Sequence, residues 1–344
     1  MESKKVRNSN MELLRILAII MIIIAHVVHN GARYQLVDKT SISIMQNGLF
    51  CLPVFYKRLF LIAGILPFGN IGNAIFILIS GYFMVERGKS IDLGKTSKKL
   101  LFQVGFGVLM RILIPIVYYK IVIPDAKSTI NMGNINEFNS LWWFPGYYLL
   151  VIFIAGVFLN GFLEKISQKT YRNMLLVIFG VFSLCWPGGL LNSLADGFRT
   201  LTCGVFLYAL GGYIKRYNPF GKIRTWVLFF VIIFTYLLMY LSYYGIVQTG
   251  IHSHLAKGRP DNEFIQPLYY VDNYTLSVVV IGVVLLELFS RIKIKNNRVI
   301  NFIAGGSLIV YLLHGHGFWI SLVQERDWIT PLSQNPLFYC FEIL

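Results

Sequence analysis

Charged residues are scarce in this chain, and acidic residues are the scarcest. Of 344 residues only 14% are charged, with 16 acidic residues against 31 lysines and arginines. A chain that is 56% hydrophobic is more apolar than a soluble domain of this length needs to be. Cysteine is also sparse, and its four scattered residues indicate neither a disulfide framework nor a metal site: Cys51, Cys185, Cys203 and Cys340. The sequence lacks a phosphate-binding glycine loop, an acid-rich nucleotide motif and a nucleophile elbow, so those enzyme classes have no support.

Long apolar runs are what the chain has in abundance. Stretches close to the roughly 20 residues that cross a bilayer recur along its whole length. The sequence therefore predicts an all-α, polytopic transmembrane helix bundle that forms one integral-membrane domain over residues 1–344. The nine expected spans are 11–30, 69–86, 100–121, 141–163, 173–187, 200–214, 225–247, 272–290 and 299–323. A further apolar segment at 337–344 is too short to cross, and we expect it to be an incomplete tenth helix.

The net charge of +15 is explained better by membrane topology than by nucleic-acid binding. With the N-terminus in the cytoplasm, every second connection is rich in lysine and arginine, namely 87–99, 165–172, 215–224 and 291–298. The intervening connections are poor in these residues. The alternation predicts a multi-pass protein of the cytoplasmic membrane with a cytoplasmic N-terminus and no nucleic-acid partner.

Two connections on the outer side are long, 31–68 and 248–271. Residues 49–66 are apolar enough to span, but Lys57 and Arg58 lie in their middle. Counting this segment as a span would reverse the charge alternation, so we expect an interfacial or re-entrant helix. The second connection, 248–271, is expected to be an outward-facing loop that contains His252 and His254.

The first apolar helix carries an arginine and a histidine. Arg15 and His26 are eleven residues apart, which is three helical turns plus roughly 20°, so both side chains share one face about 16 Å apart along the axis. Burying either group in hydrocarbon is expensive, and such residues point to a functional site. The alternative is that Arg15 snorkels to the interface and His26 caps the span.

Three further cations belong to the third span. Arg111 lies midway along it and must face protein or water. Lys98 and Lys99 open the span on the cytoplasmic side, and with Arg15 they can offer cations to phosphate groups at the inner mouth of a cavity. Ordinary flanking charge explains the two lysines equally well, but it does not explain Arg111.

All six histidines fall on the outer side in this topology. On the ninth span, Ser307, Tyr311 and His314 form a polar stripe at helical spacing. His314 is therefore either a functional imidazole or a satisfied core residue. A zinc site built from the histidine pairs at 252/254 and 314/316 is not expected, because residues two apart on a helix point to opposite sides.

Four sequence elements resemble, in order along nearly the whole chain, the motifs of the acyltransferase-3 family of polytopic membrane acyltransferases. Arg15 and His26 resemble the family's Arg-x10-His signature, and Ser80 with Gly81 resembles its Ser-Gly element. Trp142 and Trp143 resemble the aromatic opening of its fourth span, and Tyr311 with His314 resembles its late Tyr-Leu-x-His element. The small residues of the second element also permit close approach of another helix.

The resemblance implies transfer of an acyl group, usually acetyl, from cytoplasmic acyl-CoA to a carbohydrate or related acceptor on or crossing the membrane. It implies that Arg15, supported by Arg111, Lys98 and Lys99, binds the phosphate-rich donor. It also implies substrate contacts from the aromatic residues Tyr311, Trp142 and Trp143. Many family members carry an Arg-x-x-Arg element after the Ser-Gly span, whereas this chain has lysines at 95, 98 and 99 and no arginine there.

His26 is the expected catalytic residue. It would deprotonate an acceptor hydroxyl or accept the acyl group itself, with His314 as a second catalytic histidine. The expected partners are the lipid bilayer, acetyl-CoA as donor and a glycan or lipid-linked sugar as acceptor, without a metal. The alternatives are a transporter or flippase for a polar lipid or sugar, which would use the same charges as a pathway, and a sensor or structural membrane protein.

Overall fold

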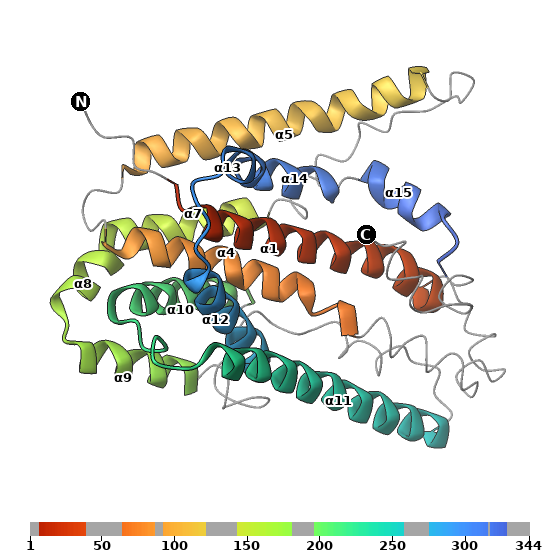
Figure 1. Cartoon of the computed structure of the whole chain (residues 1–344). Helices are drawn as coiled ribbons and strands as arrows, with labels where there is room; N and C mark the ends of the chain where they lie inside the picture. Colours follow the sequence, from red (N-terminus) through yellow and green to blue (C-terminus); the bar gives the residue numbers. More distant parts are fainter. Residues whose placement is uncertain are drawn as a thin grey trace. The chain divides into compact units, whose positions relative to one another are not determined.

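The computed structural model describes residues 7–38, 64–86, 92–121, 143–180, 196–257, 275–315 and 317–328, and every regular element in these ranges is a helix (Figure 1). The elements are α1 (Ser9–Val28), η1 (His29–Asp38), α4 (Phe68–Met84), α5 (Leu93–Ile121), α7 (Trp143–Ile154), η4 (Ala155–Leu159), α8 (Asn160–Lys165), α9 (Gln168–Phe179), α10 (Asp196–Tyr217), α11 (Thr225–Lys257), α12 (Leu276–Arg291), α13 (Arg298–Gly305), α14 (Ser307–His314) and α15 (Gly317–Glu325). The prediction of an all-α protein is confirmed for the described part of the chain.

Four helical stretches in the described residues are long and apolar enough to cross a membrane: Ser9–Gln35, Leu93–Tyr118, Phe144–Lys165 and Thr225–Ser242. A fifth arises if the broken pair Arg298–His314 and Trp319–Glu325 forms one span. These five match predicted spans. The other predicted spans correspond to shorter or less apolar helices, such as α4 with 17 residues, so the count of nine stays a prediction.

Two predicted elements differ from the observed ones. The ninth span is not one helix over 299–323, because α13 ends at Gly305 and α14 ends at His314, where the next residue, Gly315, lies outside the helix. The second difference is α11, which continues to Lys257 and places His252 and His254 in a helix rather than in a loop. Gly258 and Pro260 are the first strong helix-breaking pair after the apolar run, since Pro disfavours helical geometry in the preceding residue as well.

Several predicted features fall in the part of the chain that the structure does not describe. The interfacial or re-entrant helix at 49–66 lies almost wholly outside the described residues, and so do Trp142, His316 and the segment 337–344.

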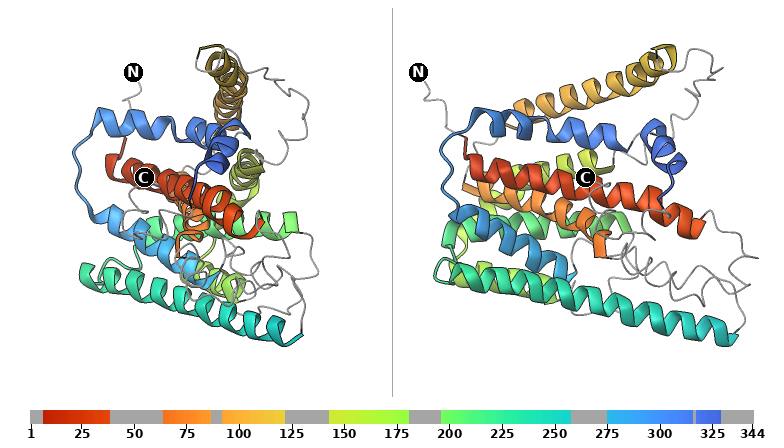
Figure 2. Two further views of the ribbon diagram at one scale, coloured as in Figure 1. Left: turned by 90° about the vertical axis from the view of Figure 1, so that its right-hand side faces the viewer. Right: turned by 45° about the vertical axis from the view of Figure 1, so that its right-hand side comes forward.

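The chain forms two compact units. The first contains Met1–Ile19, Phe76–Lys222 and Phe289–Trp319, and the second contains Ile20–Ile75, Ile223–Leu288 and Ile320–Leu344. In the first unit, α5 packs along α14 and against α7, while α10 packs on α7 and α9. Both views in Figure 2 show α5 beside α14. Helices α1 and α4 are each divided between the two units. The first unit contains α1 up to Ile19 and α4 from Phe76, and the second unit contains the remainder of both helices.

A close crossing of α4 and α10 holds the first unit together. A Cβ atom on Gly81 would overlap the carbonyl oxygen of Tyr208, and a Cβ atom on Gly211 would overlap the carbonyl oxygen of Leu78. The two glycines therefore lie against the opposite backbone in a reciprocal contact. This confirms the close approach expected from the small Ser-Gly pair, because only glycine leaves room for backbones this near.

Replacing Gly81 with alanine is expected to lower the stability of the protein by about 1–3 kcal/mol, because the new methyl group must push α4 away from α10. The matched control is Gly105→Ala on α5, where an added Cβ would meet no atom within 4 Å. This control should leave stability unchanged or raise it slightly, since alanine is the better helix former. Thermal melts of the detergent-solubilised variants measure both effects, and equal melting temperatures would contradict the observed crossing.

Buried polar side chains add a second set of contacts to the first unit. The Tyr208 hydroxyl donates to Asn160 Oδ1 at 3.2 Å, and Asn160 Nδ2 donates to the Met84 carbonyl at 3.2 Å. The Tyr171 hydroxyl donates to the Ala209 carbonyl at 2.6 Å. These bonds join α8, α9 and α10 to the end of α4. Helix α4, which carries Ser80, is therefore fixed by hydrogen bonds as well as by the close crossing with α10.

The second unit has its own apolar and polar contacts. Leu228 of α11 packs with Val284 and Leu288 of α12 in a buried cluster. At its other end, the backbone N–H of Trp328 donates to Gln35 Oε1 at 3.0 Å, which fixes the segment after α15 to the end of η1.

Candidate active site

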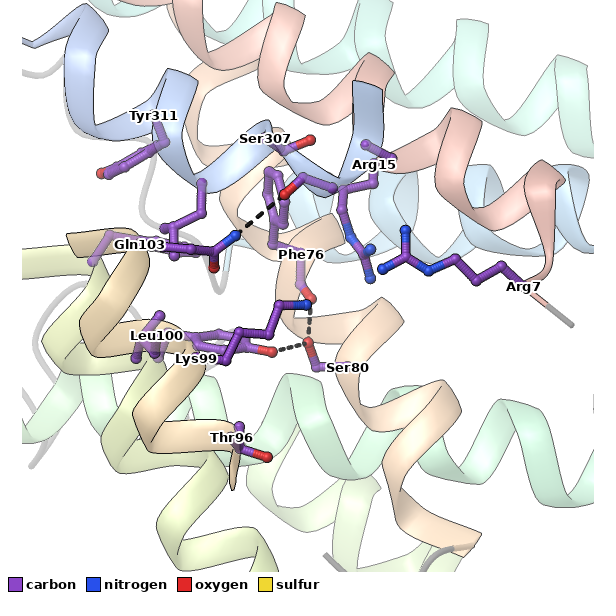
Figure 3. Close-up of a pocket in the computed structure, with 15 residues that line it drawn as sticks. Arg7, Arg15, Phe76, Ser80, Thr96, Lys99, Leu100, Gln103, Ser307 and Tyr311 are labelled. Atoms are coloured by element: carbon purple, nitrogen blue, oxygen red, sulfur yellow. Dashed lines mark hydrogen bonds between the residues drawn. The ribbon is translucent and has the colours of Figure 1, made fainter. Parts of the chain in front are cut away.

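A cavity of about 220 Å³ lies within the first unit and is lined by five parts of the fold (Figure 3). The residues before and within α1 supply two arginines, and α4, α5, α7 and the α13–α14 segment supply the rest of the wall. This volume is below the ~300–1,000 Å³ of pockets that enclose a whole small molecule. The cavity therefore suits one end of a larger ligand.

The charge of the cavity wall is positive. Arg7, Arg15 and Lys99 line it, and none of the described lining residues is acidic. Glu12 lies behind the two arginines, where Arg15 Nη1 contacts Glu12 Oε2 at 2.6 Å and Arg7 Nε lies 4.0 Å from Glu12 Oε1. One carboxylate thus faces two guanidinium groups that lie close together in Figure 3. The remaining positive charge favours an anionic ligand.

Hydrogen bonds across the fold position the start of α1. Ser9 Oγ donates to Asn301 Oδ1 at 3.0 Å and accepts from the backbone N–H of Asn297 at 2.8 Å. Asn10 Nδ2 donates to the Phe289 carbonyl at 2.7 Å. Arg7 Nη1 donates to the Asn301 carbonyl at 2.8 Å. These bonds fix both arginines relative to α13, which forms part of the cavity wall.

Aromatic residues form another part of the wall. The ring of Phe144 contacts Tyr311 at a centroid distance of 5.0 Å and stacks with Tyr148 at 6.3 Å. The Ser80 hydroxyl donates to the Phe76 carbonyl at 2.9 Å and lies 3.2 Å from the Tyr148 hydroxyl. The cavity thus joins a cationic part to an aromatic part. A ligand with a charged end and a less polar arm fits this combination.

Comparison with known proteins supplies the class of this site. Residues 8–343 match the protein family Acyl_transf_3, which is described as an acyltransferase domain. The chain belongs to this acyltransferase-3 family. No curated protein and no solved structure gives a significant match. The match covers essentially the whole chain, and it supports a membrane acyltransferase in general terms.

The structure brings three of the predicted site residues of this acyltransferase to the cavity: Arg15, Lys99 and Tyr311. His314 lies next to them, because its Nδ1 atom makes a hydrogen bond with the Tyr311 carbonyl and its ring meets the Tyr311 ring edge-on at 5.2 Å. Tyr311 is only 6% exposed, so its side chain is fixed between Phe144 and His314. Their roles in catalysis stay predictions.

The two other predicted cations of α5 do not line the cavity. Lys98 is exposed to the surroundings of the protein. Arg111 is 5% exposed, which agrees with the expectation that this arginine faces protein or water. A role for either residue in donor binding stays a prediction.

His26 lies on the same uninterrupted helix as Arg15, as the sequence predicts. It is half-buried, and its carbonyl accepts a hydrogen bond from Asn30 Nδ2 at 2.9 Å. It belongs to the second unit. The backbone of Trp143 opens α7, but its side chain lies outside the described part of the chain.

Sequence reasoning missed some contributors to the cavity. Neither Arg7 nor Gln103 is among the predicted site residues, although both line the cavity. Glu12 holds Arg15, and its spacing of three residues from that arginine on a helix is a signal that sequence reasoning could have used. Nothing local marks Gln103, because its partner is the Gly305 carbonyl, 3.2 Å away and distant in sequence.

Proposed function

We propose that this acyltransferase transfers an acetyl group from cytoplasmic acetyl-CoA to a hydroxyl group of a cell-envelope or exported polysaccharide. The observation that carries the proposal is the cavity wall with three cations and no acidic residue among those described, in a chain of the acyltransferase-3 family. CoA carries several phosphate groups, and arginine binds phosphate oxygens through two parallel N–H donors.

In the proposed complex, the phosphate-bearing end of the donor contacts Arg15, Arg7 and Lys99, and the less polar arm passes the aromatic residues. Arg15 and His26 both lie on α1, separated by about 16 Å along the axis of an ideal helix. An extended donor arm has a length suited to this separation, which would bring its thioester toward His26. Arg111 and Lys98 add positive charge along α5.

The proposed reaction needs one base. His26 takes the proton from the acceptor hydroxyl, the oxygen attacks the thioester carbonyl carbon, and the carbon–sulfur bond breaks to release CoA as a thiol that takes up a proton. In the covalent alternative, the imidazole first accepts the acetyl group and then passes it to the acceptor. His314, held by its contact with Tyr311, orients the acceptor.

The proposed setting is the cytoplasmic membrane, with the N-terminus in the cytoplasm and several membrane spans. The base-rich connections support this orientation through the positive-inside rule. The acceptor is a glycan or a lipid-linked sugar that reaches the bundle from the membrane or its outer side.

Chemical analysis of the cell envelope tests the proposal. Cells that produce the protein should carry ester-linked acetyl groups on an envelope or exported glycan, and cells without it should lose them. Mild alkaline treatment, which cleaves esters but not amides, should release the same amount of acetate that the deletion removes. An unchanged acetyl content, with a glycan or lipid precursor retained on the cytoplasmic side, would instead identify a transporter or flippase.

A further inference from the structure

The break between α13 and α14 faces the cavity. Helix α14 begins at Ser307, and Gly306 before it provides no side-chain cap. The first N–H groups of α14 therefore lack the side-chain acceptor that usually satisfies a helix N-terminus. Gly305, Ser307 and Leu308 all line the cavity. A helix start of this kind attracts anions through its N–H groups and its dipole.

Ser307 gives an independent sign of a ligand. The residue is only 3% exposed, yet its hydroxyl finds no hydrogen-bond partner among the described residues. Helical serines usually bond to a carbonyl three or four residues earlier. The Ile303 carbonyl, four residues before Ser307, accepts instead from the backbone N–H of Gly306 at 3.0 Å. A buried hydroxyl without a partner is costly, so it calls for a group that completes the site.

The surroundings of Ser307 favour an anion as that group. Gln103 Nε2 donates to the Gly305 carbonyl at 3.2 Å, so this carbonyl oxygen at the break is already paired with a donor. Arg7 Nη1 lies 3.7 Å from the position a Cβ atom would take on Gly305, so a guanidinium group borders the break itself. Arg15 lines the same cavity, and Figure 3 shows Ser307, Gln103 and the two arginines around it.

We infer that Ser307 and the first turn of α14, together with Arg7 and Arg15, form a subsite for a phosphate group. The Ser307 hydroxyl and the N–H groups donate to phosphate oxygens, and the two arginines balance the charge. The phosphate belongs either to a nucleotide, which is the donor under the proposed function, or to a lipid-linked or lipid phosphate. The nucleotide source rests on the proposed function, whereas the subsite itself does not.

Binding measurements on the full-length protein in maltoside, a detergent without phosphate, test this subsite. The soluble probe is adenosine 3′,5′-bisphosphate, and the lipid probe is dihexanoyl phosphatidic acid. Ser307→Ala should weaken binding of at least one probe on the order of tenfold, because it removes a hydrogen bond to a charged group. Ser307→Thr keeps the hydroxyl and should retain most of the affinity. Ser277→Ala, which removes a half-buried hydroxyl of α12 outside the cavity lining, should bind as the wild type does.

Thermal melts separate binding from folding. Without a probe, Ser307→Ala should melt at the same temperature as the wild type or higher, because it removes an unsatisfied buried hydroxyl. With a probe, its stabilisation should be smaller. Weaker binding of the bisphosphate alone identifies a nucleotide site, and weaker binding of the phosphatidic acid alone identifies a lipid-phosphate site.

Two results would overturn the subsite: wild-type affinity of folded Ser307→Ala for both probes, or no binding of either probe to the wild type. The assay is independent of acyl transfer. Ser307-dependent phosphate binding without any acetyl transfer would reject the proposed function and keep the subsite. Acetyl transfer together with phosphate binding that does not depend on Ser307 would keep the proposed function and reject the subsite.

Discussion

Replacing His26 with alanine is expected to abolish acetyl transfer while leaving the protein folded and able to bind acetyl-CoA. Loss of a general base lowers turnover by about 10²–10⁴-fold, and loss of a covalent acceptor lowers it further. His26 shares one face of α1 with Arg15, eleven residues before it, as expected for a residue at the reacting end of a donor held by that arginine. The measurement is CoA release from acetyl-CoA by the purified protein with membrane glycan present.

The matched control for this variant is His29→Ala. His29 Nε2 lies 3.0 Å from Arg33 Nη1, and since arginine can only donate, this nitrogen of His29 is engaged as an acceptor. We therefore expect a much smaller loss of turnover from His29→Ala than from His26→Ala. A thermal melt confirms that both variants are folded. Near-normal turnover by folded His26→Ala would remove His26 from the mechanism.

Arg15→Ala is expected to weaken binding of acetyl-CoA by about tenfold to a hundredfold, the range of a lost charge-assisted hydrogen bond. Arg15→Lys should restore only part of this affinity, because a point charge cannot reproduce two parallel donors on one phosphate. In the free protein, Arg15 contacts Glu12 at 2.6 Å, so a bound phosphate competes with or extends an existing ion pair.

The control for Arg15→Ala is Arg172→Ala, which removes an exposed arginine of α9 outside the cavity lining. It changes the net charge by the same amount, so it measures any general electrostatic attraction of CoA. Isothermal titration calorimetry with both variants at two salt concentrations separates this long-range attraction from direct contact. Equal affinities of Arg15→Ala and the wild type would show that Arg15 does not bind the donor.

Much of the fold could be predicted because it depends on local sequence. The apolar run after Arg15 predicts α1, and the small pair at Ser80 and Gly81 permits a close helix crossing; the structure contains both. The helix ends were less predictable. The adjacent glycines at 305 and 306 interrupt the ninth span, whereas the separated Gly245 and Gly250 do not interrupt α11. Local glycine content alone does not decide between these outcomes, because tertiary contacts also act on each site.

The cavity depends on contacts that no local pattern reveals. In the sequence, Arg7 looks like any other cation that flanks a span. Its place at the cavity depends on hydrogen bonds from Ser9 to Asn301 and from Asn10 to Phe289, which are far apart in the sequence. The unsatisfied hydroxyl of Ser307 likewise emerges only when the hydrogen bonds around it are known. Arg15, in contrast, could be identified from the sequence. The free-energy cost of burying an arginine in lipid and the helix face that it shares with His26 both follow from one helix.

Acetyl transfer by the purified protein in liposomes tests the central claim most directly. Acetyl-CoA carrying a labelled acetyl group is added on the side of the N-terminus, and free CoA thiol and labelled glycan ester are measured together. The account predicts that the two products appear in equal amounts, that both require the glycan acceptor, and that both are lost in His26→Ala. Movement of a lipid or sugar across the membrane without any release of CoA would contradict it.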